Sequence, residues 1–291
     1  MSATTLPRRL AGWWFAPLPL ARLAWLRTIV YGFVFVDVLI TTSWVPMHAQ
    51  TPSELYRPLF LARLLPLPTP GPVTVPAVMV TLLVCAGLAL SGRLPRLAGA
   101  AVFLLYLQWM LIAFSYGKVN HDRVALLVAL AVLPTGGRAG HRDGTASDAA
   151  GWAIRCIQVA VVLTYFLSTL AKLRYGGLEW LDGSTLLRGV LRRGTSFGDG
   201  LRDYPGLLHA AQYGIVAFEL TSPLLLARGL FGRIYLGFAA VFHLVTWATL
   251  KITFLPHTVC LLAFLPLERL PVPSLTARSV TGEVPLRSGE R

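Results

Sequence analysis

Long apolar runs dominate this chain and restrict what it can fold into. An apolar stretch of about 20 residues crosses a bilayer as a helix, because a helix satisfies its own backbone hydrogen bonds where no water is present. Only 13% of the residues are charged, whereas a soluble domain has about 25%. We therefore predict an all-α polytopic integral membrane bundle of seven or eight transmembrane helices. The apolar runs lie at residues 23–44, 75–91, 97–116, 119–133, 151–173, 207–227, 234–250 and 252–267.

The flanking polar segments divide the chain into three parts. We predict an N-terminal tail at residues 1–19, a transmembrane helical domain at 20–268, and a polar, disordered C-terminal tail at 269–291. The net charge of +13 comes from arginines that lie mostly at the ends of the apolar runs. Arginines in such positions contact lipid headgroups and set topology. This pattern favours membrane lipids over nucleic acid as partners, and it places the N-terminus in the cytoplasm.

Reactive side chains are few within the apolar runs. The sequence has no CxxC motif and no cluster of cysteine with histidine, so we predict neither a metal site nor a disulfide. The three cysteines each lie in an apolar run, at Cys85, Cys156 and Cys260.

Three basic residues are of particular interest, because ionisable groups inside a membrane are costly and usually face a bundle interior or a wet cavity. Lys172 either extends to the headgroups or lies in a pocket, where loss of hydration favours the neutral amine and a role as general base. His121 either belongs to a polar turn or donates to a ligand. His243 either bonds a neighbouring helix or belongs to a site. The acids Asp37 and Glu219 are expected to pair with an arginine on a neighbouring helix.

Several short motifs occur in an order and spacing typical of one family. They are Leu23-Ala24-Trp25-Leu26-Arg27, Asn120-His121, Tyr165-Phe166 with Lys172-Leu173, Trp180-Leu181-Asp182-Gly183, Phe218-Glu219-Leu220 and Phe242-His243. Together they resemble the HTTM family, the membrane region shared by vitamin K-dependent γ-glutamyl carboxylase and its bacterial relatives. The resemblance covers residues 20–267 and implies an integral protein of a bacterial plasma membrane.

The resemblance implies a function and a set of site residues. It implies a γ-carboxylase-like enzyme, of the carbon–carbon lyase or monooxygenase type. Such an enzyme uses a reduced quinone of the vitamin K or menaquinol type with O2 to generate a strong base, which forms a carbanion that captures CO2. Lys172 corresponds to the catalytic base, while Ala171 stands where the carboxylase has another lysine. His121 and His243 would also be catalytic, and the cofactor-binding residues would be Asn120, His121, Tyr165, Trp180 and His243.

A large domain that binds the substrate follows the membrane region of the carboxylase. This sequence ends at Arg291, so we expect a small substrate, or a substrate peptide supplied by a partner membrane protein. The alternative is a membrane protein without enzymatic activity, namely a transporter, a scaffold that binds quinone or lipid, or a partner subunit. A cavity lined by Lys172, His121 and His243 would favour the enzyme.

Overall fold

The computed structural model describes residues 5–272 and is almost entirely helical. The predicted tails fall partly outside this range, at residues 1–4 and 273–291. Two-residue strands β1 (Leu18–Pro19) and β2 (Ala146–Ser147) form one antiparallel pair that joins the start of the chain to the start of α7. The α-helices are α1 (Thr5–Trp14), α2 (Leu20–Val36), α3 (Phe60–Leu64), α4 (Thr74–Leu90), α5 (Pro95–Phe114), α6 (Val124–Val132), α7 (Asp148–Gly176), α8 (Ser184–Arg193), α9 (Ser196–Asp199), α10 (Pro205–Leu220), α11 (Leu230–Leu250) and α12 (Leu255–Leu261).

Four of these helices are long and apolar enough to cross a membrane, as the sequence predicted in outline. They are α2 with its extension at Leu20–Thr41, α5, α7 and α11. The prediction of seven or eight spans is met only in part. Helices form within all eight apolar runs, but α4 and α12 are shorter, and the nine residues of α6 rise only about 14 Å at 1.5 Å per residue. The hydrocarbon core is about 30 Å thick, so α6 alone cannot cross it.

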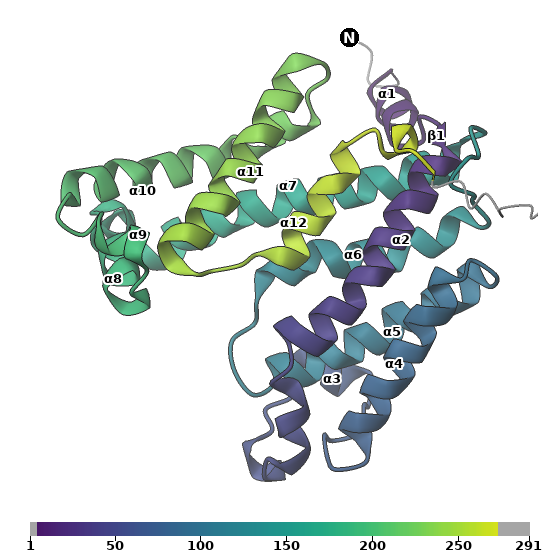
Figure 1. Cartoon of the computed structure of the whole chain (residues 1–291), viewed down its shortest axis with the longest axis horizontal. Coiled ribbons are helices and arrows are strands. Elements are labelled where there is room, and N and C mark those ends of the chain that lie inside the picture. The colour runs from purple at the N-terminus through teal and green to yellow at the C-terminus, as the bar shows by residue number, and fades with distance from the viewer. Residues whose placement is uncertain (1–4, 273–291) are drawn as a thin grey trace, which may run out of the picture.

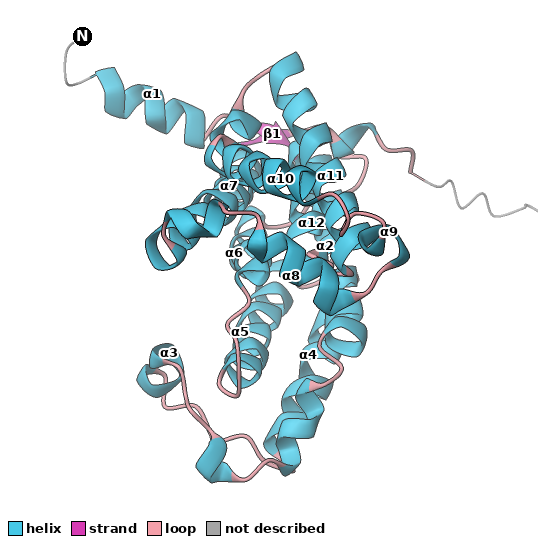
Figure 2. Cartoon of the chain, turned by 90° about the vertical axis from the view of Figure 1, so that its left-hand side faces the viewer, coloured by secondary structure: helices cyan, strands magenta, loops and turns pink. Residues whose placement is uncertain are grey.

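The helices form two regions (Figure 1). We call α2, α4, α5 and α6 the N-terminal bundle, and α7 to α12 the C-terminal bundle. The N-terminal bundle contains most of the densely packed core, including the fully buried Leu26, Tyr106, Trp109, Leu126 and Leu130. α6 packs on α7 and α12 and so connects the two bundles. α1 projects away from both (Figure 2).

α7 is the longest helix, and its ends are specified by local sequence. The Ser147 hydroxyl accepts a hydrogen bond from the Ala150 N–H, as an N-cap residue should. The helix ends before Gly177, whose φ of 62° is a left-handed conformation that glycine adopts without steric cost. The 29 residues between these ends carry Tyr165 and Lys172 into the C-terminal bundle.

Candidate functional site

A cavity of about 810 Å³ lies inside the C-terminal bundle. Its wall is built from α7 to α12 and from the single 3-10 turn η4 (His121–Arg123) that precedes α6. Apolar side chains make up most of the wall, and a small group of polar side chains converges on it, as in many ligand-binding pockets. The polar group comprises Lys118, His121, Asp122, Thr164, Tyr165, Ser168, Lys172, Trp180, Thr185, Glu219, His243, Thr246, Thr249 and His257.

Helical spacing explains how α7 supplies several of these groups. Tyr165, Ser168 and Lys172 are three and four residues apart, so they lie on one face of the helix. That face packs against α10, which carries Glu219. The sequence pattern therefore places a phenol, a hydroxyl and an ammonium along one wall of the cavity.

Lys172 forms an ion pair with Glu219 inside this wall. Its ammonium donates to both carboxylate oxygens of Glu219, and the Thr169 hydroxyl donates to Oε2 of the same carboxylate at 2.5 Å. The ammonium also lies 5.1 Å from the centre of the Trp180 ring, a cation–π distance. Glu219 and Trp180 thus hold Lys172 in the cavity wall. Glu219 pairs with this lysine, so the expectation that it pairs with an arginine is wrong.

Tyr165 and two histidines form a second polar group in the wall. The Tyr165 hydroxyl and His243 Nε2 are 2.6 Å apart. His257 packs edge-on against the Tyr165 ring, with centroids 4.5 Å apart, and its own ring is 5.6 Å from that of His243. Within residues 5–272 no partner exists for His243 Nδ1 or for either nitrogen of His257. Buried polar atoms are rarely left unpaired in native proteins, so a water molecule or a ligand is the expected partner of these nitrogens.

The turn η4 brings His121 and Asp122 to the same cavity. The His121 ring lies 6.3 Å from the ring of Phe254, on the loop before α12. Asn120 directly precedes this turn but is not in the cavity lining.

The cavity thus collects five of the six site residues predicted from the sequence. Lys172, His121, His243, Tyr165 and Trp180 line it, and Asn120 does not. Sequence reasoning missed the roles of two others. Glu219 was expected only to pair with an arginine on a neighbouring helix, although it lies in one of the motifs. His257 was missed because it lies in the short apolar helix α12. Pro256, at the start of that helix, marks a helix boundary but gives no indication of a functional site.

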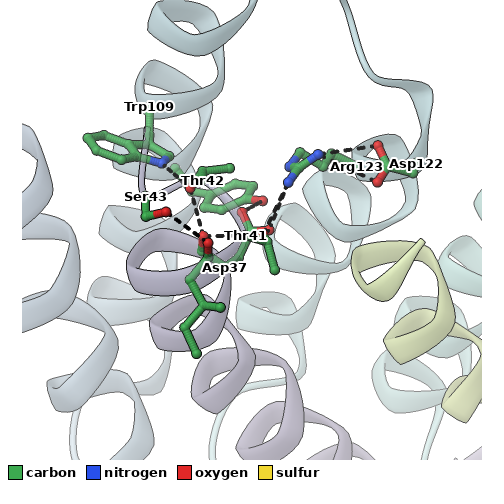
Figure 3. Close-up of polar contacts among 9 residues, drawn as sticks. Asp37, Thr41, Thr42, Ser43, Trp109, Asp122 and Arg123 are labelled. Atoms are coloured by element: carbon green, nitrogen blue, oxygen red, sulfur yellow. Dashed lines mark hydrogen bonds and ion pairs between the residues drawn. The ribbon is translucent and has the colours of Figure 1, made fainter. Parts of the chain in front are cut away.

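A separate ion-pair cluster lies in the N-terminal bundle (Figure 3). A π-helical turn, η1 (Asp37–Thr41), extends α2 and presents Asp37. Arg123 Nη2 donates to Asp37 Oδ1 at 3.1 Å, and the Tyr106 hydroxyl donates to Oδ2 at 2.7 Å. Arg123 also approaches Asp122, at 3.4 Å. The prediction that Asp37 pairs with an arginine is confirmed.

No model of a known protein family matches this chain, and no curated protein or solved structure gives a significant match. The resemblance to the HTTM family therefore rests on the sequence motifs alone. Residues 5–272 also hold no group of three or more His, Cys, Asp or Glu side chains arranged to bind a metal ion.

Proposed function

We propose that this chain is a membrane enzyme that binds a reduced quinone in the cavity of the C-terminal bundle and acts as a γ-carboxylase-like catalyst. The observation that carries the proposal is the arrangement of the Lys172–Glu219 pair and the unpaired ring nitrogens of His243 and His257 around one apolar volume. We also propose that the shorter helices α4, α10 and α12 complete a bundle of seven spans in a bacterial plasma membrane, and that α6 enters the bilayer without crossing it.

The residues present fit a reduced quinone. Its aromatic rings suit the apolar wall, and its hydroxyl groups can bond imidazole nitrogens that otherwise lack partners, on His243 and His257. When bound, the reduced quinone would supply, with O2, a base strong enough to form a carbanion that captures CO2. The substrate that loses this proton would come from a small molecule or from a peptide on a partner membrane protein.

The Lys172–Glu219 pair would remove the first proton. An ammonium cannot accept a proton, so Lys172 can act as a base only after it passes one of its own protons to Glu219. The net result is a protonated Glu219, while Lys172 keeps its positive charge beside the new anion. Charge held in place inside a cavity of low dielectric constant stabilises such an anion better than water does. The role of general base, which the sequence assigned to Lys172 alone, thus belongs to the Lys172–Glu219 pair.

The Tyr165 hydroxyl would orient His243 through the bond to its Nε2. That bond leaves His243 Nδ1 to face a ligand, because the two ring nitrogens are distinct and a partner on one fixes the role of the other. His121 would interact with the ligand from η4.

The test uses purified protein in nanodiscs with a reduced naphthoquinone and O2, and measures the naphthoquinone epoxide. Lys172→Met is expected to lower the rate about 100-fold or more, since a positioned proton-transfer group contributes that much. Lys251→Met is the matched control, because Lys251 is exposed at the end of α11 and does not line the cavity. Unchanged epoxide formation in Lys172→Met would reject the proposal.

A quinone- or lipid-binding scaffold without catalysis is the second candidate. The observation in its favour is that Glu219 already satisfies the Lys172 ammonium, so the pair needs no reaction to explain its burial. A scaffold would bind the naphthoquinone in the same experiment but form no epoxide. Binding would then depend on His243 and His257 and not on the charge of Lys172.

A further inference from the structure

α11 differs from the other three candidate spans in how little of it is covered by protein. Only 17% of its apolar window is buried, against 50–56% in α2, α5 and α7. An exposed apolar surface of this kind is suited to contact with lipid. We therefore expect α11 to form the boundary between the C-terminal bundle and the bilayer.

The lipid-facing side of this boundary is also part of the cavity wall. Phe238, Val241 and Val245 on α11 line the cavity, and they are 62%, 55% and 46% exposed. On α10, Leu207 lines the cavity and is 54% exposed. Side chains on both helices thus combine a place in the cavity wall with a largely uncovered surface. This combination is what an opening on the apolar side of the cavity, between α10 and α11, would give.

The packing of the two helices is consistent with an opening between them. α10 packs on α7 and α8, whereas α11 packs on α9 and on η7 (Ser222–Leu226), the turn that follows α10. The helices meet near η7 and run apart from there (Figure 1). We call the gap between them the lateral opening, with Leu207, Gly214, Phe238, Val241 and Val245 in its rim.

The end of the cavity opposite η7 is covered by α8 and α9. Leu186 and Val190 of α8 and Phe197 of α9 face the cavity. The Thr195 hydroxyl, between these helices, donates to the Thr249 carbonyl of α11 at 2.9 Å and ties the cover to the end of that helix. The arginines of α8 are exposed, at Arg188, Arg192 and Arg193.

We infer that the cavity takes a ligand with a long apolar tail, which reaches it from the bilayer and leaves its tail in the lateral opening. This inference rests on the proposed function for its polar end and extends it to the ligand's overall shape. The hydroxylated ring lies with Lys172, His243 and His257. The tail runs past Gly214 and Val241 into the bilayer. There it stays in contact with lipid, as it was before binding.

Gly214 allows a direct test of the opening. It lines the cavity on α10, and a Cβ added there meets no atom within 4 Å, so a large side chain can be introduced without clashing at its base. Gly237 on α11 is also exposed and also meets nothing within 4 Å, but it does not line the cavity. Gly214→Trp and Gly237→Trp are therefore matched variants, with Val241→Trp as a second obstruction from the other side of the opening.

The experiment measures binding to protein in nanodiscs under anaerobic conditions. The probes are a naphthohydroquinone with a four-isoprene tail and its tail-less parent. Gly214→Trp and Val241→Trp are expected to weaken binding of the tailed probe about 10-fold or more, because forcing a tail past an added ring overpacks the opening. Binding of the tail-less probe should change less than about 2-fold, and Gly237→Trp should affect neither probe.

Each other outcome has a distinct meaning. Equal binding of the tailed probe by Gly214→Trp, Val241→Trp and wild type overturns the lateral opening but leaves the proposed function intact. The same holds if both probes are lost together in well-folded Gly214→Trp and Val241→Trp. If wild type binds neither probe, the proposed function fails and the ligand assignment with it. Self-association of wild type that both Gly214→Trp and Gly237→Trp disrupt would mark this face as a protein interface and overturn the inference.

Discussion

The two bundles each contain a buried ion pair, and the surroundings of these pairs differ. In the N-terminal bundle, the side chains of Asp37 and Arg123 are 0% and 8% exposed, and Thr41 and Tyr106 complete the contacts of the Asp37 carboxylate. In the C-terminal bundle, Lys172 is 22% exposed and faces the cavity. A buried ion pair is therefore not by itself a sign of a functional site. The signal is an ion pair beside an apolar volume that also contains unpaired polar atoms.

This difference predicts that removal of the cation from an ion pair destabilises the protein most in the N-terminal bundle. Arg123→Met leaves Asp37 without its cation in a place that water cannot reach, so it should destabilise the protein by about 3–5 kcal/mol. The midpoint of thermal unfolding in detergent micelles measures this effect. Arg63→Met is the control, because Arg63 is exposed on α3. Equal midpoints for the two variants would contradict the structural role of the Asp37–Arg123 pair.

Removal of the cation should lower the stability less in the C-terminal bundle. In Lys172→Met, Thr169 still donates to Glu219 and the cavity admits water to the carboxylate. We expect a loss of about 1–3 kcal/mol, the range for one unpaired buried group. Adding Glu219→Gln should recover part of the stability without recovering epoxide formation. A destabilisation as large as that of Arg123→Met would remove the distinction between the two pairs.

A smaller effect is expected for the bond between Tyr165 and His243. Tyr165→Phe removes one hydroxyl and should lower stability by about 1 kcal/mol, as for a typical hydrogen bond. It should also weaken binding of the tail-less naphthohydroquinone, because His243 then loses its orientation. Binding titrations of this variant are compared with Tyr213→Phe, whose ring is 53% exposed on α10. Unchanged binding in Tyr165→Phe would separate His243 from the ligand site.

The smallest effect concerns a partly exposed pair that lies outside both sites. The Arg22 guanidinium donates to both oxygens of Glu268 at 2.6 Å. This hydrogen bonding holds the pKa of Glu268 below its ordinary value of 4.5. Its contribution to stability, at most about 1 kcal/mol for such a pair, is therefore present at neutral pH and lost as the pH falls through the lowered pKa.

Thermal unfolding of wild type and Glu268→Gln tests this pH dependence. Wild type should have the higher midpoint at neutral pH, and the two midpoints should converge in acid, where both side chains are neutral. A difference that grows as the pH falls would contradict the sign of the pKa change.

Much of the fold could be predicted from the sequence, because a bilayer imposes a strong local rule. Apolar runs long enough to span it must become helices, and helices occur within every predicted run. The number of complete spans could not be predicted with the same certainty. α6 and α12 are short because the chain turns at η4 and at Lys251, where φ is 51°, and hydropathy does not report such turns.

The candidate site likewise has one part that could be predicted from the sequence and one part that could not. Lys172, His121 and His243 could be singled out from the amino-acid order, because ionisable residues are rare and costly within apolar runs. The folded bundle was needed to show that Glu219, 47 residues along the chain, pairs with Lys172 and that His257 lies beside His243. Pairing depends on which helix faces pack together, and that is settled by side-chain shape across the whole bundle, which no local pattern encodes.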